Sequence, residues 1–192
     1  MAHIRLPDRP LTDGVLSLRP WRADDVPALV AAVSDPEIPY WTTVPSPYAE
    51  SDATSWFATH APALETQTGL SFAIVDAASD ELLGSIGLVS VTVEDARAEV
   101  GYWVGAHARR RGVATAAVRV LAAYVLRDLE FERLELYADV DNVASRGVAE
   151  RAGFTLEGVA RSFAWRGAER RDFAVYSLLP SELPQRWLPP HA

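Results

Sequence analysis

Apolar and polar side chains alternate along the beginning of the chain in short stretches. Residues 15–19 alternate with a period of two, which is typical of a β-strand with one buried face. Two longer apolar stretches, residues 70–75 and 82–91, predict further strands, and the short polar segment 76–81 between them suits a hairpin. The pattern therefore predicts an antiparallel start to a sheet.

Two helices are expected between the first strand and this hairpin. Residues 24–33 form the first helix and residues 51–65 the second, which has Ser51 or Asp52 as its candidate N-terminal cap. Four prolines lie between the helices, within residues 36–47. Because proline fixes its φ angle, this segment is predicted as an ordered loop rather than a helix.

Strands and helices alternate in the second half of the chain. Residues 99–104 and 134–140 are predicted strands. A long helix over residues 112–128 lies between them, with apolar residues recurring on one face. A shorter helix over residues 144–151 is followed by Gly153, which suits a C-terminal cap.

The chain closes with two strands, from residue 154 onward and over residues 171–179, around a turn at residues 166–167. A meander followed by alternating strands and helices indicates an α/β or α+β sheet with helices on its faces. Because there is neither an internal repeat nor a flexible linker, the 192 residues predict one domain. Pro-rich segments 7–10 and 180–190 are expected to trail from it.

Composition narrows the classes of function. Hydrophobic residues make up 49% of the chain and charged residues 23%, as in an ordinary soluble protein. No apolar run reaches the ~18 residues that span a bilayer, and residues 1–13 lack the apolar core of a signal peptide. We therefore expect a cytoplasmic protein without a membrane partner. The absence of cysteine excludes disulfides, thiolate metal ligands and a cysteine nucleophile.

Charge narrows the classes further. The formal net charge is −8, which opposes general binding to nucleic acid. Two of the four histidines lie at the termini, so no metal site is predicted. All 18 basic residues are arginines, and three of them are consecutive at residues 109–111, which reverses the sign of the charge locally.

The sequence Arg-Arg-Arg-Gly-Val-Ala-Thr occupies residues 109–115, between a predicted strand and the long helix. A tight turn there presents free backbone N–H groups, to which the helix dipole adds partial positive charge. Gly112 and Ala114 leave the backbone bare enough for a phosphate to approach, and the arginines add formal charge. Because the segment is neither a P-loop nor a G-x-G-x-x-G fingerprint, it predicts a pyrophosphate site of a third kind. A solvated arginine loop is the alternative.

The pattern Arg109-x-x-Gly112-x-Ala114 resembles the acetyl-CoA pyrophosphate loop of the GCN5-related N-acetyltransferase (GNAT) superfamily. Downstream, Asn-Val-Ala-Ser at residues 142–145 and Glu-Arg-Ala-Gly-Phe-Thr-Leu-Glu-Gly at residues 150–158 resemble its RimJ/RimL branch, which includes enzymes that acetylate ribosomal-protein N-termini. The other matching segments are residues 16–20, 99–103 and 171–178. The resemblance covers about residues 12–180, the expected core of a single acetyltransferase domain over residues 1–192.

The resemblance implies a GNAT fold, a mixed and mostly antiparallel sheet of about seven strands flanked by about four helices. In this superfamily the fourth strand splays from the fifth, and the pantetheine arm of acetyl-CoA pairs with the exposed backbone. The corresponding strands here are residues 99–104 and 134–140. The implied activity is direct transfer of acetyl from acetyl-CoA, the co-substrate, to an amine, without a metal.

The resemblance also assigns roles to individual residues. Asn142 would hydrogen-bond the pantetheine arm, and Ser145 would lie near the thioester sulfur, where a hydroxyl can donate to the departing thiolate. Without the resemblance, a helix cap is the favoured interpretation of Asn142, and an ordinary first-turn residue that of Ser145. The residues implied to line the gap are Tyr102, Trp103 and Val104, and those implied to hold the pyrophosphate are Arg109, Arg110, Arg111, Gly112, Val113, Ala114 and Thr115.

The reaction needs a base, because an ammonium ion has no lone pair with which to attack. Glu99 is the first candidate, since several relatives use a carboxylate at the start of this strand; a surface charge at a strand end is the alternative. Some RimL-like enzymes instead carry a glutamate in the strand after Gly-Phe-x-x-Glu-Gly, where this chain has Ala164. Asp172 and Glu157 are weaker candidates.

The acceptor groove is expected to be formed by residues 21–33, 35–48 and about 163–171. It is expected to include Tyr40, Trp41 and Trp165, because large aromatic side chains often line ligand grooves, with simple packing as the alternative. A protein N-terminal α-amine is the leading acceptor. Two alternatives stay open: a small amine, such as an aminoglycoside, a polyamine or an amino acid, and a non-catalytic acyl-CoA-binding domain. A homodimer is an open possibility as well.

Overall fold

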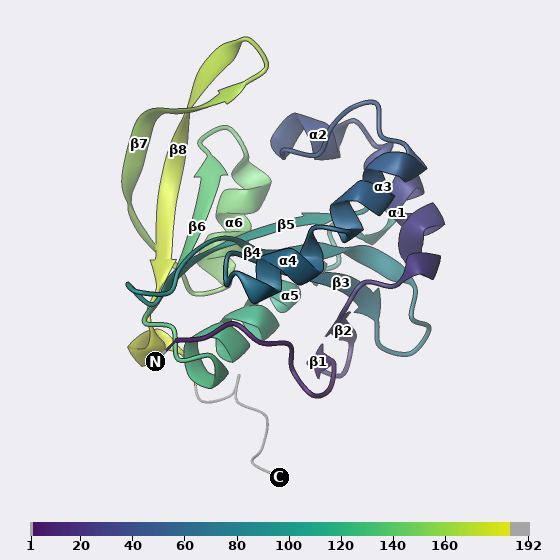
Figure 1. Ribbon diagram of the computed structural model, residues 1–192. Helices are drawn as coiled ribbons and strands as arrows, with labels where there is room; N and C mark the ends of the chain where they lie inside the picture. Colours follow the sequence, from purple (N-terminus) through teal and green to yellow (C-terminus); the bar gives the residue numbers. More distant parts are fainter. Residues whose placement is uncertain (1, 185–192) are drawn as a thin grey trace.

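The computed structural model describes residues 2–184, and within them eight strands form one sheet in the order β1-β2-β3-β4-β5-β6-β8-β7 (Figure 1). Neighbouring strands run antiparallel except β5 and β6, which are parallel. The strands are β1 (Leu11–Thr12), β2 (Leu16–Arg19), β3 (Leu70–Asp76), β4 (Leu82–Thr92), β5 (Arg97–Val104), β6 (Arg133–Asp139), β7 (Thr155–Arg166) and β8 (Glu169–Leu178). The mixed, mostly antiparallel sheet is confirmed, and the short edge strand β1 makes the count eight rather than about seven.

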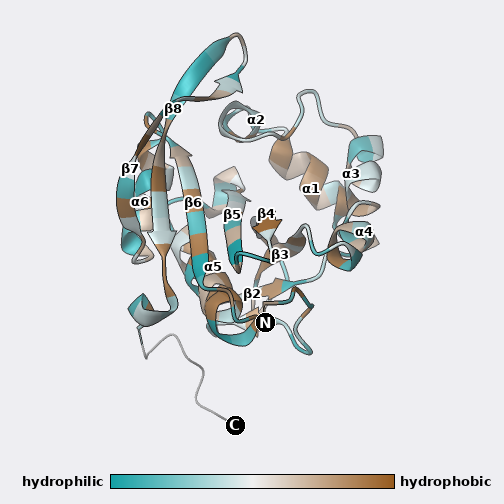
Figure 2. Ribbon diagram, turned by 60° about the vertical axis from the view of Figure 1, so that its left-hand side comes forward, coloured by the Kyte–Doolittle hydropathy of each residue, from teal (hydrophilic) through white to brown (hydrophobic). Residues whose placement is uncertain are grey.

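Helices cover both faces of this sheet. The helices are α1 (Val26–Val33), α2 (Glu37–Trp41), α3 (Glu50–Phe57), α4 (His60–Glu65), α5 (Val113–Ala123) and α6 (Val143–Arg151). The predicted long helix begins at Val113 and continues beyond α5 as a π-helical turn, Tyr124–Asp128. In Figure 2 the most apolar segments are α1, α5 and the central strands, so apolar residues gather where helices meet the sheet.

Two cores result, one on each face. The larger core lies between the sheet and α5, where Phe72, Leu121 and Leu134 are fully buried. The smaller core lies on the opposite face, under α1 to α3, and includes Leu29 and Trp103. Because the central strands bury side chains on both faces, their sequences are apolar over most of their length.

The Pro-rich segment is not the loop that the sequence predicted, because Glu37–Trp41 forms α2. Pro36 caps this helix with a φ of −62°, and Pro39 occupies its third position. Neither proline breaks it, because the N–H groups of a first helical turn have no partner within the helix.

The predicted helix over residues 51–65 is two helices, α3 and α4. Pro62 explains the break, since its ring clashes with the carbonyl four residues earlier and it offers no N–H to continue α3. The predicted cap is wrong as well: Ala49 is the capping residue, and Asp52 lies three positions into the helix, where its carboxylate accepts a 2.8 Å hydrogen bond from the Ala49 N–H.

The N-terminal segment does not trail from the domain. Ala2 and Ile4 lie in the larger core with exposed fractions of 5% and 1%, and the His3 N–H donates to the Leu129 carbonyl. Residues 7–10 therefore link a buried segment to β1. At the other end, Pro180–Glu182 forms a short helical turn and Leu183 packs against the larger core. Residues 185–190 of the predicted Pro-rich segment lie outside the described residues.

Candidate active site

The strands β5 and β6 are paired only where they begin. Their register pairs end at Glu99 with Glu135. Beyond that point β5 stays paired with β4 as far as Val104, and β6 stays paired with β8 as far as Asp139. The β6-facing edge of residues 100–104 is thus left without a strand partner, as predicted for the fourth and fifth strands of the sequence analysis. Backbone groups along such an edge need another partner.

A cleft of about 990 Å³ occupies this split, which is within the size range of small-molecule sites. It reaches both faces of the sheet. On the α5 side its lining includes Gly112, Val113, Ala114, Thr115, Asn142 and Ser145, and on the α2 side it includes Glu37, Trp41, His60, Glu99, Arg166 and Phe173. Two molecules that enter from opposite faces can therefore meet at the split.

The start of α5 is open toward the cleft. Gly112 is the capping residue, with φ at +80°, a conformation that glycine adopts without steric cost. A Cβ atom built on Gly112 meets nothing within 4 Å, so there is room in front of the turn. Since the first N–H groups of a helix lack partners within it, those of Val113, Ala114 and Thr115 suit an anion.

The three consecutive arginines lie in different surroundings. Arg109 donates from Nε to the Val104 carbonyl at 3.1 Å, and its Nη2 pairs with Asp35 Oδ2 at 2.6 Å. Arg110 is exposed at the edge of the cleft, with φ at +62°. Arg111 is exposed and lies outside the cleft lining. Arg109 thus links the end of β5 to Asp35. Arg110 adds a positive charge at the edge of the cleft.

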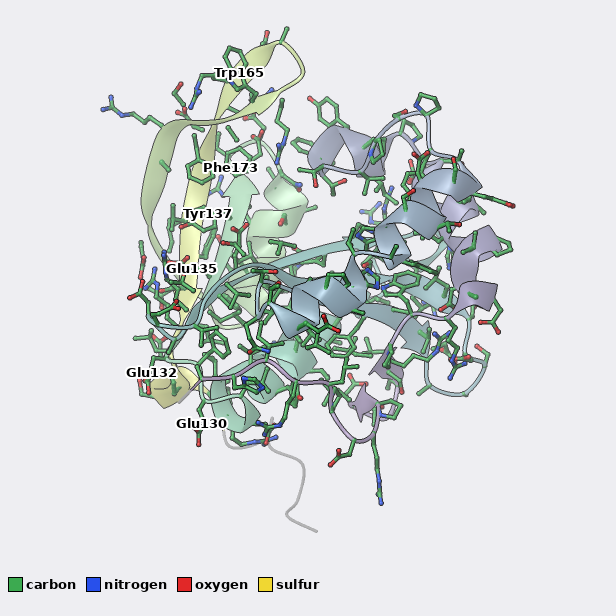
Figure 3. All side chains as sticks on the ribbon, viewed as in Figure 1. Glu130, Glu132, Glu135, Tyr137, Trp165 and Phe173 are labelled. Carbon is green, nitrogen blue, oxygen red and sulfur yellow. The ribbon has the colours of Figure 1, made fainter. Side chains whose placement is uncertain are left out.

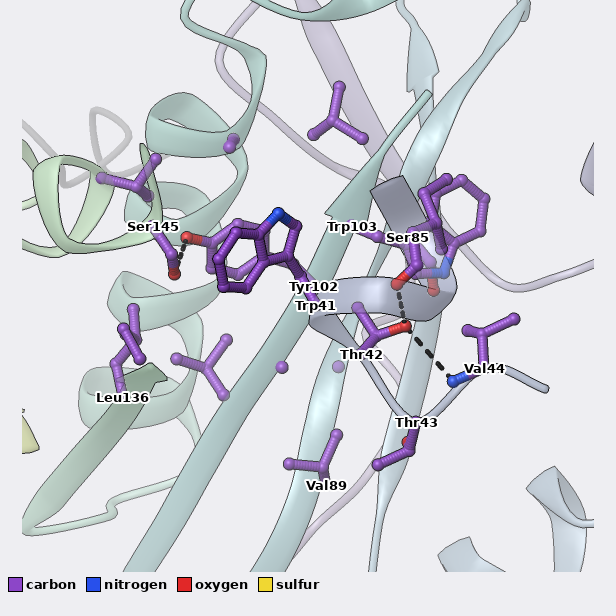
Figure 4. Close-up of a pocket in the computed structure, with 18 of the residues that line it drawn as sticks. Trp41, Thr42, Thr43, Val44, Ser85, Val89, Tyr102, Trp103, Leu136 and Ser145 are labelled. Carbon is purple, nitrogen blue, oxygen red and sulfur yellow. Dashed lines mark hydrogen bonds between the residues drawn. The ribbon is translucent and has the colours of Figure 1, made fainter. Parts of the chain in front are cut away.

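Asn142 and Ser145 lie at the start of α6, across the split from Tyr102. Asn142 Oδ1 accepts a 2.9 Å hydrogen bond from the Ser145 N–H, so Asn142 does cap the helix. The Ser145 and Tyr102 hydroxyls lie 2.9 Å apart and point toward one another (Figure 4). Burial raises the pKa of Tyr102 to about 12, against smaller opposing effects of Ser145 and Arg151. The pair is therefore protonated near neutral pH.

Glu99 lies where the strands part, opposite Glu135. Burial raises the pKa of the Glu99 carboxyl, and the nearby charge of Glu135 raises this pKa further. Glu135 itself accepts hydrogen bonds from Arg133 (Nε to Oε1, 2.8 Å) and Arg97 (Nη1 to Oε2, 3.4 Å). Among the described residues Glu99 has no such partner. A half-buried carboxylate with a raised pKa beside a cleft has the properties of a general base.

The three aromatic residues expected at the acceptor groove lie in different places. Trp41 lines the cleft, and its indole N–H donates to Glu37 Oε2 at 3.1 Å. Tyr40 contacts Trp41 edge-on but is 59% exposed and outside the lining. Trp165 is 61% exposed near the tip of the β7–β8 hairpin (Figure 3).

The β7–β8 hairpin was expected to contribute to the acceptor groove through residues 163–171, although only Trp165 was singled out within it. The register of β7 shifts between Ala160 and Ala164, with φ at +53° at Ser162, whose N–H donates to Asp172 Oδ1 at 2.6 Å. Such a bulge bends a strand. Phe163 stacks on Tyr137 with ring centroids 5.1 Å apart, and Arg166, three residues further along β7, lines the cleft.

His60 was likewise not singled out from the sequence. Its ring lies 4.5 Å from that of Trp56, edge to face, on the α2 side of the cleft. Burial lowers the pKa of His60, and its Nε2 has no hydrogen-bond partner among the described residues. The imidazole of His60 is therefore uncharged near neutral pH.

Within residues 2–184 there is no cluster of three or more histidine and acidic side chains arranged to bind a metal. Nor does this part of the chain contain a helix with the length and apolar character needed to cross a membrane.

Known proteins with similar sequences identify the class. The split sheet is the one expected of the GNAT fold, and the matches below show an N-acetyltransferase. Residues 16–155 match the family model of the acetyltransferase (GNAT) domain. The YdaF protein of Bacillus subtilis (strain 168), whose name assigns it provisionally to the ribosomal N-acetyltransferases, is 33% identical over 135 residues, 70% of this chain and 70% of its own. The chain belongs to the GNAT family.

Two further proteins confirm the resemblance to the RimJ/RimL branch. The ribosomal-protein-serine acetyltransferase of Escherichia coli (strain K12) is 30% identical over 98 residues, which are 51% of this chain and 55% of that protein. The structure of Mycobacterium smegmatis RimJ in complex with CoA-disulfide superimposes with a TM-score of 0.82 at 25% identity, covering 92% of this chain and 88% of the other.

Proposed function

We propose that this protein transfers the acetyl group of acetyl-CoA to the α-amine at a protein N-terminus. The observation that carries the proposal is the split between β5 and β6, which joins an anion-binding turn on one face to a carboxylate, Glu99, on the other. The names of YdaF and of the Escherichia coli relative, and the CoA-disulfide bound to RimJ, support the choice of substrates.

In this proposal the pyrophosphate of acetyl-CoA is held at residues 109–115, mainly by backbone N–H groups. The open space at Gly112 fits such a group. The unpaired edge of residues 100–104 suits the amides of the pantetheine arm. Asn142 uses Oδ1 for its helix, so its amide nitrogen is the group left to bind the arm. Trp103 is only 9% exposed and offers its backbone rather than its ring.

The chemistry needs two proton transfers, and the cleft has one residue or pair for each. Acetyl-CoA supplies an activated thioester. Glu99 accepts a proton from the acceptor ammonium, directly or through water, which frees the nitrogen lone pair to attack the thioester carbonyl. The Tyr102 hydroxyl, hydrogen-bonded to Ser145, donates a proton to the sulfur when the carbon–sulfur bond breaks. The second proton that the acceptor nitrogen loses as the amide forms restores the Tyr102 hydroxyl.

The location and assembly expected from the sequence belong to the same proposal. A cytoplasmic enzyme would meet its acetyl-CoA and newly made protein N-termini in one compartment. The oligomeric state, a monomer or a homodimer, is to be tested with the purified chain. A small amine is the alternative to a peptide as the acceptor, and it is tested with the same protein.

The test is incubation of the purified protein with acetyl-CoA and a panel of amines, with thiol release as the readout. We expect turnover with unblocked peptides and none with the same peptides blocked at the α-amine. Mass spectrometry should place the acetyl group on the N-terminal nitrogen. Turnover confined to small amines would contradict the proposed acceptor, and acetyl-CoA binding without any turnover would contradict the enzymatic role.

A further inference from the structure

Four arginines of the described residues line the cleft: Arg109, Arg110, Arg151 and Arg166. Arg109 is paired with Asp35. Arg110 and Arg151 belong to the turn before α5 and to α6, on the α5 side, where the proposed function places phosphates. Arg166 is different, because it comes from β7 and lies on the α2 side, which the proposed function assigns to the acceptor.

The position of Arg166 follows from the aromatic residues beneath it. Its guanidinium carbon lies 5.2 Å from the centroid of Phe173. Phe173 pairs in register with Asp139 of β6, and Tyr137, two residues before, lies on the same face as Glu135 and Glu99. Figure 3 shows Phe173, Tyr137 and Glu135 in a row along these strands. The row therefore joins the neighbourhood of Glu99 to Arg166.

Arg166 has no carboxylate partner within residues 2–184. None of the ion pairs in this part of the chain includes it, although Glu169 stands opposite in the hairpin register. Its Nη1 donates to the Trp165 carbonyl at 3.2 Å, and its Nε is shielded from solvent without an acceptor. A cation that rests on an aromatic ring with an unused donor gains from an anionic partner, and a guanidinium binds a carboxylate through two parallel bonds.

The nearby charges do not supply that partner. Asp139 and Asp141 are paired with Arg171, and Glu37 accepts from Trp41. The α2 side of the cleft thus has a negative end at Glu99 and a positive end at Arg166, with aromatic rings between them. Such a pair of charges matches a molecule with an ammonium at one end and a carboxylate at the other.

The distance between the two ends indicates the size of that molecule. Glu99 lies opposite Glu135, and Phe173 lies opposite Asp139, four residues further along β6. Four residues of a strand span about 13 Å. An extended peptide covers this length in about four residues as well, whereas a free amino acid carries its amine and its carboxylate on the same carbon atom.

We propose that Arg166 binds an acidic side chain at the second to fourth position of the acceptor peptide, and so selects acidic N-termini. The inference rests on the proposed N-terminal acetylation and adds the chemical class of the acceptor. It also runs against the net charge of −8, which by itself would favour basic acceptors.

The test compares peptides that carry a single glutamate, moved from position two to position six, with the same peptides carrying glutamine. We expect the wild-type enzyme to favour glutamate at positions two to four by about tenfold in kcat/KM, mainly through KM. Arg166→Gln should remove this preference, so that the ratio of kcat/KM between the glutamate and the glutamine peptides falls to about one. Arg166→Lys should restore part of it.

The matched control is Arg161→Gln, which makes the same charge change on the same strand at an exposed position outside the cleft lining. It should keep the preference. The acetyl-CoA Kd and the Tm of each variant show whether donor binding or folding has changed as well. A weaker acetyl-CoA affinity in Arg166→Gln, or an equal loss on both peptide series, would overturn the assignment, as would a wild-type enzyme indifferent to the glutamate.

The failure of the proposed function would look different. If the wild-type protein released no thiol with any peptide, N-terminal acetylation itself would be wrong, and the role of Arg166 with it. If it acetylated glutamate and glutamine peptides equally, only the role of Arg166 would be wrong.

Discussion

The two sides of the cleft differ in what lines them. On the α5 side one contiguous segment, residues 109–115, presents backbone groups fixed by a helix start. On the α2 side the lining comes from side chains of α2, β5 and β7, among them Trp41, Glu99 and Arg166. Backbone groups persist when side chains are replaced, so the α5 side suits a ligand that all members of a family bind. The α2 side can change its ligand by substitution while the fold is kept.

The largest effect is expected on the α5 side, from Gly112→Asp. A carboxylate there would face the pyrophosphate, and like charges in contact cost several kcal/mol, so we expect acetyl-CoA affinity to fall by about 1000-fold. Isothermal titration would measure it. Gly167→Asp is the control, since Gly167 also has a positive φ, at +60°, and open space but lies at the hairpin tip. Equal acetyl-CoA affinities in the two folded variants would refute the phosphate site.

Glu99→Gln should separate the chemistry from binding on the α2 side. Loss of a general base typically lowers turnover by about 100-fold or more, whereas acetyl-CoA affinity should not change. Because burial raises the pKa of Glu99, the wild-type rate should fall as the pH drops through that pKa and the carboxylate takes up a proton. The variant should lack this acidic limb. Glu94→Gln, at an exposed turn position, should retain it; a normal rate in Glu99→Gln would exclude Glu99 as the base.

Tyr102→Phe tests the hydroxyl pair that lies between the two sides. We expect kcat to fall by about 100-fold, because the leaving sulfur loses a proton donor. Ser145→Ala should cost a similar factor, and the double variant should be little worse than either single one, because the two hydroxyls act as a unit. Independent, multiplying losses in steady-state kinetics would show that the two groups act separately.

The smallest effect is expected at the base of the hairpin. Hydrogen bonds from Arg133 and Ser177 lower the pKa of Glu157 to about 2. A lowered pKa means that this carboxylate stabilises the fold above its unfolded pKa and ceases to do so as the pH falls toward 2. Because Glu157 is 41% exposed, Glu157→Gln should cost only about 1 kcal/mol at pH 7. Urea unfolding should show the gap to wild type closing in acid, with kcat unchanged.

Much of the α5 side could be predicted from the sequence, because it depends on residues close together in the chain. The turn at Gly112 and the cap at Asn142 have local causes, a backbone angle and a helix start. The split between β5 and β6 was expected through the family resemblance rather than from periodicity. The segment Glu37–Trp41 was misassigned, because proline disfavours the interior of a helix but is tolerated in its first turn.

The hydroxyl pair and the α2 side were harder to predict, because their contacts join distant residues. Tyr102 and Ser145 are 43 residues apart, and nothing local shows that their hydroxyls meet. Glu135 is a charged residue between two leucines of a strand, and this pattern could have singled it out from the sequence. Only the parallel register of β5 and β6 places it opposite Glu99. Arg166 reaches the cleft through a bulge around Ser162, a feature with no signature in the sequence.

The split between β5 and β6 also affects the stability of the protein against unfolding and degradation. An arm that lies along residues 100–104 would serve as a ninth strand, so the fold would be complete only while the donor molecule is bound. A ligand present at 100 times its Kd adds about 2.7 kcal/mol to the free energy of unfolding. The abundance of this enzyme would then follow the concentration of acetyl-CoA, because molecules without bound acetyl-CoA would unfold and be degraded first.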